Sequence, residues 1–170
     1  QKKSENTYKD GEIELYTRWY ENGKKENKGT YKDGEKDGLW SYWNEDGQKE
    51  KEITYKDGNL VDEWTFYYEY YNNGQKKVEG TYKDGIEDGK WTWWYENGQK
   101  KVEGTYKDGI RDGKWTYWDK NGQKSEEITY KNGKEDGLYT LYYENGQKKY
   151  EGIIKGKNES GNFIKEGKWT

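Results

Sequence analysis

The stretch of sequence that decides the fold covers residues 88–109 and reads DGKWTWWYENGQKKVEGTYKDG. Two runs rich in aromatic and β-branched residues flank a central Glu-Asn-Gly, and such runs are typical of β-strands. Asn-Gly between two strands is a strong signal of a hairpin with a type I′ turn. The stretch therefore predicts a hairpin that turns at Asn97-Gly98, followed by a second, longer connection that starts at Lys107 and includes Gly113.

The same pattern recurs along the chain in two markers. Tyr-Lys-Asp-Gly or Tyr-Lys-Asn-Gly begins at Tyr8, Tyr31, Tyr55, Tyr82, Tyr106 and Tyr130. The glycine of the Glu-Asn-Gly motif or its variants keeps the same spacing, at Gly23, Gly47, Gly74, Gly98, Gly122 and Gly146. Two markers in one register indicate tandem repeats of about 24 residues. We expect an all-β fold, an elongated antiparallel meander of tandem β-hairpins in a single curved sheet.

The repeats also set the domain organisation. We expect one repeat domain over residues 1–170, with six hairpin units over about 8–154 and a partial seventh unit at the C-terminus. The last strand, at residues 168–170, is predicted to pair with Phe163-Ile164 or with the preceding return strand. A meander has two edges, and edge strands invite further pairing. Self-association through an edge is therefore left open.

Composition excludes several classes of function. The 170 residues include 10 Trp and 19 Tyr, but no His and no Cys. Without them there is no Cys/His metal centre, no disulfide and no His-activated nucleophile. Both signs of charge are interleaved and the net charge is -3, which argues against nucleic acid and against a membrane surface as partner. We therefore predict no catalytic residue, no cofactor and no metal site.

Register arithmetic assigns the aromatic residues to two faces of the sheet. If Asn97-Gly98 is a two-residue loop, residue numbers across the hairpin sum to 195, which pairs Trp91 with Gly104, Trp93 with Val102 and Tyr95 with Lys100. The equivalent pairs elsewhere are Tyr16 with Gly29, Trp40 with Ile53, Trp115 with Ile128 and Tyr139 with Gly152. A ring can cover the bare backbone of a strand glycine. We call this side the first face and expect it to be the better buried; its column is Trp40, Trp64, Trp91 and Trp115, with Tyr82 and Tyr106 from return strands.

The opposite side, the second face, carries another aromatic column. Its members lie three residues after the first aromatic of their unit and are Trp19, Trp43, Trp94, Trp118 and Tyr142. Their predicted partners are all polar, namely Glu26, Glu50, Lys101, Ser125 and Lys149. Flat rings at regular spacing suit a platform for a ligand or partner. Alternatively, the rings stabilise a thin sheet while lysine stems lie over them.

The third unit breaks the spacing. It is three residues longer than the others between Trp64 and Gly74. We expect a bulge or a wider turn within residues 65–71, with a bend of the sheet or a projecting loop. Glu63 and Glu69 lie in this break, but the carboxylates elsewhere recur in every unit and form no singular pair of the kind that glycoside hydrolysis needs.

The Asp-Gly turns superficially suggest calcium loops. The stretch at residues 84–89 is an example. A calcium loop needs oxygen ligands at its third and twelfth positions, where this chain has Ile86 and Tyr95. Turn chemistry explains the Asp-Gly pairs without a metal.

The pattern at residues 88–109 resembles the MORN repeat, and it is most similar to a bacterial variant found in proteins catalogued as antitoxins. The resemblance runs from Tyr8 to about Ile154 and returns at residues 166–169. It implies an elongated sheet of stacked hairpins that acts as a binding or scaffolding module. Eukaryotic members are linked to membranes, but this chain departs from them in its Lys/Glu richness and its Glu-Asn-Gly turns.

Together these features predict a non-enzymatic scaffold that binds a protein partner through the second face, in an antitoxin- or immunity-like role. The alternative is a carbohydrate or cell-wall binding module that uses the same aromatic column. The chain starts at Gln1 without an initiator Met, which suggests that an upstream segment has been removed. A bacterial protein located outside the cytoplasm is therefore left open.

Overall fold

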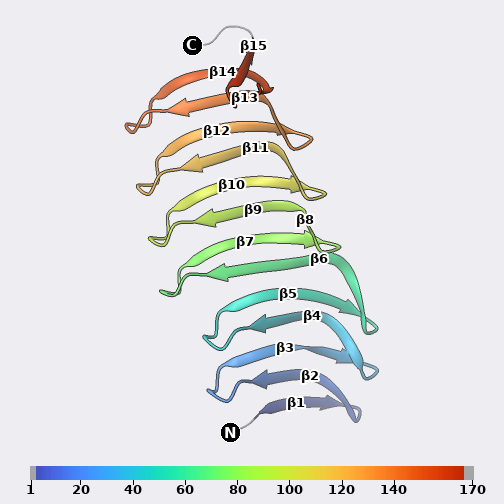
Figure 1. The fold of residues 1–170 in the computed structure, drawn as a ribbon. Coiled ribbons are helices and arrows are strands. Elements are labelled where there is room, and N and C mark those ends of the chain that lie inside the picture. The colour runs from blue at the N-terminus through green and yellow to red at the C-terminus, as the bar shows by residue number, and fades with distance from the viewer. Residues whose placement is uncertain (1–2, 167–170) are drawn as a thin grey trace.

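The computed structural model describes residues 3–166, with side chains throughout except at residues 61–65. These residues form one antiparallel sheet in which the strands follow one another in chain order, apart from one two-residue strand that pairs beside this path (Figure 1). The strands are β1 (Ser4–Lys9), β2 (Glu12–Trp19), β3 (Lys25–Lys32), β4 (Glu35–Trp43), β5 (Lys49–Lys56), β6 (Asn59–Tyr70), β7 (Lys76–Lys83), β8 (Ile86–Glu87), β9 (Gly89–Trp94), β10 (Lys100–Lys107), β11 (Ile110–Trp118), β12 (Lys124–Lys131), β13 (Lys134–Tyr142), β14 (Lys148–Lys157) and β15 (Phe163–Glu166). The predicted meander of tandem hairpins is confirmed.

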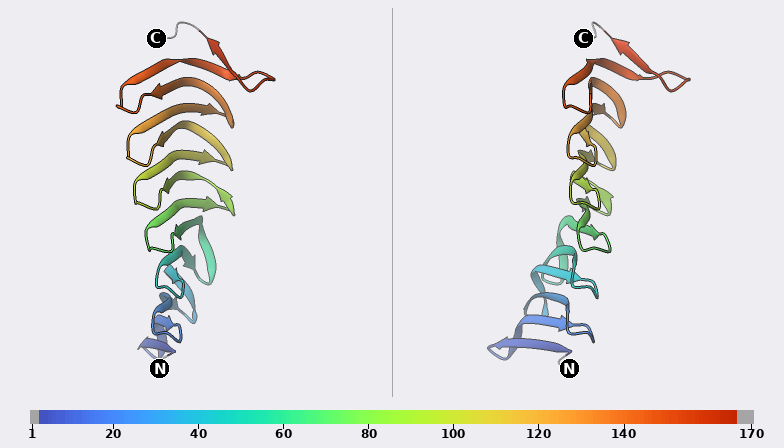
Figure 2. Two further views of the ribbon diagram at one scale, coloured as in Figure 1. Left: turned by 60° about the vertical axis from the view of Figure 1, so that its left-hand side comes forward. Right: turned by 90° about the vertical axis from the view of Figure 1, so that its left-hand side faces the viewer.

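The sheet is a single open layer with its ends far apart. Figure 2 shows that the strands bow along their length and that, in the described part of the chain, no second sheet or helix covers either face. A single layer cannot bury side chains between two layers, as most domains do. Burial must therefore come from contacts between successive hairpins on the same face.

The Glu-Asn-Gly motif forms a three-residue loop. The amide of Tyr95 donates to the carbonyl of Gln99 at 2.8 Å, and the amide of Gly98 donates to the carbonyl of Tyr95 at 2.9 Å. Gly98 has a φ of 83°, whereas Asn97 is not among the residues with positive φ. This is a type I turn followed by a glycine in the left-handed region. The predicted type I′ turn at Asn97-Gly98 is wrong.

The type I′ turn lies instead at the Asp-Gly motif. Asp108 and Gly109 have φ of 50° and 78°, and Lys107 pairs directly with Ile110. The predicted longer connection is therefore wrong, because the chain reverses in two residues. The non-glycine residues with positive φ are all at this position, namely Asp10, Asp33, Asp57, Asp84, Asp108 and Asn132. Asp and Asn tolerate the left-handed region better than other side chains, which explains the motif.

A bulge restores the predicted strand register despite the different turn. Lys100 pairs with Trp94, so the predicted pair of Tyr95 with Lys100 is wrong. The register then shifts by one residue before Val102, which pairs with Trp93 as predicted. The other confirmed pairs are Trp91 with Gly104, Tyr16 with Gly29, Trp40 with Ile53, Trp115 with Ile128 and Tyr139 with Gly152.

The first face holds the core, as predicted. Trp115 is fully buried, and Trp40 and Trp91 are nearly so. Trp115 lies flat on Gly104 of the preceding return strand, where an added Cβ would come within 2.2 Å of the indole. Trp40 covers Gly29 and Trp91 covers Gly80 in the same way. Each tryptophan thus covers the glycine of the previous unit, in addition to pairing with its own hairpin partner.

On the first face, the size of an aromatic ring and the identity of the residue that it covers change together. Where the next ring is Tyr139 instead of tryptophan, the position of the covered glycine is taken by Ile128. Both side chains are buried, at 8% and 5% exposure. The tyrosine ring is smaller than an indole, and the isoleucine side chain fills space at the contact where the other pairs have only a glycine. The burial of both side chains shows that this pair is also closely packed.

The extra residues of the third unit lie earlier than predicted. Tyr67 pairs with Gly80 and Tyr70 with Lys76, so the end of β6 keeps the register of the other units. The predicted site of the insertion within residues 65–71 is therefore wrong, because the additional residues precede Tyr67. Tyr67, not Trp64, has the first-face position opposite the glycine; the side chain of Trp64 is outside the described ones.

A bulge absorbs part of the insertion, as predicted. The register between β5 and β6 shifts by three residues between Ile53 and Tyr55, whereas the equivalent shift is two residues between β3 and β4 and between β12 and β13. β6 is also displaced along β5, because Tyr67 pairs with Lys51 and not with Ile53. Figure 2 shows the strands before β6 turned relative to those after it. Among the described side chains, the ring contacts of the first face form one run from Tyr16 to Tyr55 and another from Tyr67 to Tyr130, and Tyr139 contacts Phe163 separately. At the C-terminal end, β15 pairs with β14, and the strand predicted at residues 168–170 is outside the described residues.

Candidate functional site

The five predicted site residues lie at equivalent places on the second face. Each ends the outgoing strand of its hairpin, next to the three-residue loop, and each is half-buried. They are Trp19, Trp43, Trp94, Trp118 and Tyr142. Every one pairs with a lysine, namely Lys25, Lys49, Lys100, Lys124 and Lys148 in that order. The predicted partners Glu26, Glu50, Lys101, Ser125 and Lys149 are wrong by one residue, because the bulge follows the loop.

Lysine side chains lie over several of these rings. The ammonium of Lys25 is 5.7 Å and that of Lys49 is 5.8 Å from the ring centroid of Trp43. Lys76 lies 5.4 Å from the centroid of Trp94. In the next unit Lys100 is 5.7 Å from Trp118. These distances are within reach of cation–π attraction. The rings are therefore packed with lysines, of the preceding unit for Lys25, Lys76 and Lys100 and of the same hairpin for Lys49, as one of the two interpretations of the column predicts.

A row of glutamates neutralises part of this lysine row. The carboxylate of Glu127 accepts from Lys114 at 2.6 Å and from Lys124 at 2.8 Å, and also from the hydroxyl of Tyr142 at 2.7 Å. Burial alone would raise the pKa of Glu127, but these hydrogen bonds outweigh it and lower the pKa to about 2. The carboxylate is thus charged at neutral pH and fixes two lysines and one tyrosine.

Small hydroxyl side chains form the floor of the second face. Thr92 and Thr140 are almost fully buried. The hydroxyl of Thr140 donates to Glu151 at 3.2 Å. Thr17 and Thr116 are also buried. Sequence reasoning marked these positions as polar and missed their burial, because it comes from the side chains of neighbouring units.

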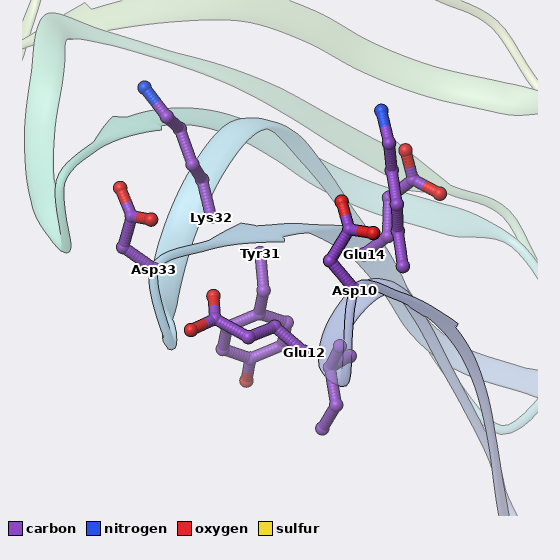
Figure 3. A pocket seen from close by; sticks show the side chains of 8 residues that line it. Asp10, Glu12, Glu14, Tyr31, Lys32 and Asp33 are labelled. Atoms are coloured by element: carbon purple, nitrogen blue, oxygen red, sulfur yellow. The ribbon is translucent and has the colours of Figure 1, made fainter.

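The cavity at the first two Asp-Gly turns and the carboxylates around it do not form a catalytic or metal-binding arrangement. A cavity of about 460 Å³ lies between the first two Asp-Gly turns. Figure 3 shows its labelled carboxylates pointing in different directions, namely Asp10, Glu12, Glu14 and Asp33. Among residues 3–60 and 66–166, whose side chains the structure describes, no three His, Cys, Asp or Glu residues are grouped as metal ligands would be. Glu69 pairs with Lys77 at 2.7 Å, and the side chain of Glu63 is not described.

Comparison with known families agrees with the repeat structure. The profile of the MORN repeat variant matches the chain at residues 15–33, 36–57, 63–84, 87–108, 111–132 and 135–155. Each match covers an outgoing strand, its three-residue loop and a return strand, which is one hairpin of the sheet. No curated protein matches the sequence.

Two further findings bear on function. MORN repeat proteins are generally non-catalytic repeat modules. The part of the chain that the structure describes contains no helix of the length and apolar character that crossing a membrane requires. The six matches cover most of the sequence and coincide with the six observed hairpins. The chain therefore belongs to the MORN repeat variant family.

Proposed function

We propose that the chain is a non-enzymatic scaffold that binds a protein partner through the second face of its sheet. The observation that carries this proposal is the half-buried aromatic column, set between a row of lysines and a row of glutamates in unit after unit. Aromatic anchors surrounded by polar groups are typical of protein interfaces. A flat, repetitive surface also suits an extended contact better than a small molecule.

The exposed area supports an interaction role. The chain exposes 11030 Å². A compact protein of 20.4 kDa exposes roughly 8,800 Å². The difference is of the same order as the roughly 1,600 Å² that a standard protein–protein interface buries in total. The folded open layer thus exposes enough surface to form an interface of standard size with a partner.

The packing of the rings favours protein over carbohydrate. Sugars stack on the flat face of an aromatic ring, and that face must be free. Lysine ammonium groups lie within 6 Å of the ring centroids of Trp43, Trp94 and Trp118. A sugar would have to displace them, whereas a protein partner offers carboxylates with which these lysines pair.

The replacement of Trp94 and Trp118 together by Ser tests the proposal. We expect the variant to keep its far-ultraviolet circular dichroism and to lose the partners that the wild type captures in pull-down mass spectrometry. The matched control replaces the exposed Tyr8 and Tyr143 by Ser, which removes two rings outside the column. Capture that survives the double tryptophan change, or glycan-array binding without protein capture, would overturn the proposal.

The antitoxin-like role is a narrower form of the same proposal. Its support is the sequence resemblance to the bacterial variant, and it requires the partner to be a toxic protein. If so, co-expression of this chain should restore growth to cells that express the product of the neighbouring gene. Growth that stays inhibited, with both proteins present at equal levels, would contradict this role.

Self-association through the sheet edges also stays a prediction. In the described residues, β1 and β15 are the first and last strands of the sheet. The backbone groups on the outer side of an edge strand are available for pairing. Sedimentation that shows a mass rising with concentration supports the prediction, and a monomer over the whole concentration range contradicts it.

A further inference from the structure

Strand β6 departs from the other outgoing strands on the second face. Phe66 and Tyr68 pair with Thr81 and Glu79, just as Lys90 and Thr92 of β9 pair with a threonine and a glutamate. The position of Tyr68 holds a small hydroxyl residue in the other five units, namely Thr17, Ser41, Thr92, Thr116 and Thr140. β6 thus places two large rings where β9 has a lysine and a threonine and where β4 has Leu39 and Ser41.

A hollow lies beside these two rings. It has a volume of about 300 Å³, and its walls include Phe66, Tyr68, Lys90 and Thr92. Gly80 forms part of its floor. Phe66 is 47% exposed, so one wall of the hollow is an apolar ring in contact with water. The volume is at the lower end of the roughly 300–1,000 Å³ of ligand sites, which suits a side chain better than a free ligand.

The tyrosine wall is held in place by the preceding unit. The hydroxyl of Tyr68 donates to Glu52 at 3.3 Å. Lys76 lies 5.5 Å from the centroid of the Tyr68 ring. Glu52 is itself fixed by Lys49 at 2.6 Å. The ring is therefore positioned before any partner arrives, which reduces the entropy that binding costs.

The rim of the hollow carries excess positive charge. Lys90 has a side chain that is 64% exposed, and its carboxylate partner is Glu103 at 3.0 Å. Glu103 also binds Lys100 at 2.6 Å, so two ammonium groups share one carboxylate. On the other side of the hollow, Glu79 is already paired with Lys76. A carboxylate from outside therefore has an electrostatic match at Lys90.

We propose that this hollow, the β6 anchor pocket, receives an apolar side chain of a protein partner, with a neighbouring carboxylate of the partner bound to Lys90. The inference rests on the proposed function, because it identifies the anchor point of the same face. Interface energy concentrates in a few residues that insert into such pockets. Sites that break a local sequence rule are also where function is expected in a repeat protein.

The test exchanges the pocket for the residues of another unit. Phe66→Lys with Tyr68→Thr gives β6 the pair that β9 carries, which the same sheet already accommodates. The matched control is Leu138→Lys, because Leu138 has the position of Phe66 in its unit and the same exposure of 47%. The probe is a displayed library of random peptides, selected on the full chain, with affinities of the enriched peptides measured by fluorescence anisotropy.

We expect the enriched peptides to carry an apolar residue beside Asp or Glu. The β6 exchange should weaken their binding by about 10-fold or more, which corresponds to about 1.4 kcal/mol. The Leu138→Lys control should stay within about two-fold of the wild type. Lys90→Glu, a surface change outside the wall rings, should weaken acidic peptides in the same direction and gives a second readout if the β6 exchange unfolds.

The outcomes separate this inference from the proposed function. One outcome would overturn the anchor pocket alone. In it, the peptides bind the β6 exchange and Lys90→Glu as tightly as the wild type, but they lose binding when Trp94 and Trp118 are both replaced by Ser. Peptides that are insensitive to all of these variants contradict both proposals. The absence of any enriched peptide, or binding of glycans that the β6 exchange abolishes, also overturns the pocket as a protein site.

Discussion

Trp115 and Trp118 lie three residues apart on β11, and they show how differently the two faces use an aromatic ring. Trp115, on the first face, is fully buried against Gly104, and its indole N–H donates to the carbonyl of Thr105 at 3.2 Å. Trp118, on the second face, is half-buried and lies beneath Lys100. Trp115 provides the burial that a second layer of structure would provide in most domains. Trp118 instead contacts charged side chains that are accessible to water or to a partner.

The largest expected effect is the difference between removing these two rings. Trp115→Ala should reduce the free energy of unfolding by about 3–5 kcal/mol, because it opens a cavity and exposes the backbone of the preceding unit. Trp118→Ala should cost about 1 kcal/mol, since its ring is partly solvated already. Urea titration of both variants measures this difference. Equal losses would show that the two faces contribute equally to the fold.

A double-mutant cycle tests the packing rule of the first face. Gly104→Ile alone should be strongly destabilising, by about 2–3 kcal/mol, because the side chain would overlap the Trp115 ring. Trp115→Tyr alone leaves a void. The two together recreate the pair that Ile128 and Tyr139 form in the next unit. We expect the double variant to recover at least about 1 kcal/mol relative to the sum of the single changes, and additive losses would contradict the rule.

The repeat, the strand pairing and the two faces were predictable because they depend on local periodicity. The pairing of Trp91 with Gly104 follows from the spacing of the aromatic residues within one hairpin. The turn types were not predictable in this way, because Asn-Gly and Asp-Gly both suit a type I′ turn. A bulge after Lys100 compensates for the third loop residue, so two different turns give the same pairing farther from the loop.

The candidate site was predictable in its ring positions but not in its surroundings. The lysine partner of Trp118 differs from the predicted Ser125 by one residue, for the same reason as the turn. The burial of Thr92 and the pocket beside Phe66 depend on contacts between neighbouring units. Those contacts depend on the strand register between neighbouring hairpins. The periodicity within one unit gives the register inside a hairpin but not the register between two hairpins.

The adjacent residues Glu126 and Glu127 should respond to pH in opposite directions. On the second face, hydrogen bonds from Lys114 and Lys124 outweigh burial and lower the pKa of Glu127 to about 2. A lowered pKa gives stability that is present above about pH 4.5 and is lost as the pH falls toward 2. Glu127→Gln should therefore reduce the stability at pH 7 by about 2 kcal/mol and flatten the acid limb of the stability profile.

On the first face, burial raises the pKa of Glu126, although the hydroxyl of Tyr139 and the charge of Lys157 act against it. A raised pKa means that the stability is fully present below the pKa of the unfolded chain and is lost as the pH rises through the folded value. Glu126→Gln should therefore be more stable than the wild type at pH 7 and equal to it in acid. Urea midpoints between pH 2 and pH 7 measure both variants, and shifts of the same sign would contradict the contrast.

The smallest expected effect concerns the cations that cover the rings on each face. The guanidinium of Arg111 lies 4.3 Å from the centroid of the Trp115 ring and donates to the hydroxyls of Tyr117 and Tyr130, both at 3.0 Å. Arg111→Met should cost about 1–2 kcal/mol, because the hydroxyls of the buried Tyr130 and the half-buried Tyr117 lose a charged donor. Lys100→Met on the second face keeps the stem over Trp118 and should cost about 0.5 kcal/mol. This second loss should also shrink with added salt, since Lys100 is an exposed cation and screening weakens its interactions in the wild type. A loss for Lys100→Met as large as that for Arg111→Met would mean that the second-face rings depend on their cations for stability, and this would weaken the case that the surface is available to a partner.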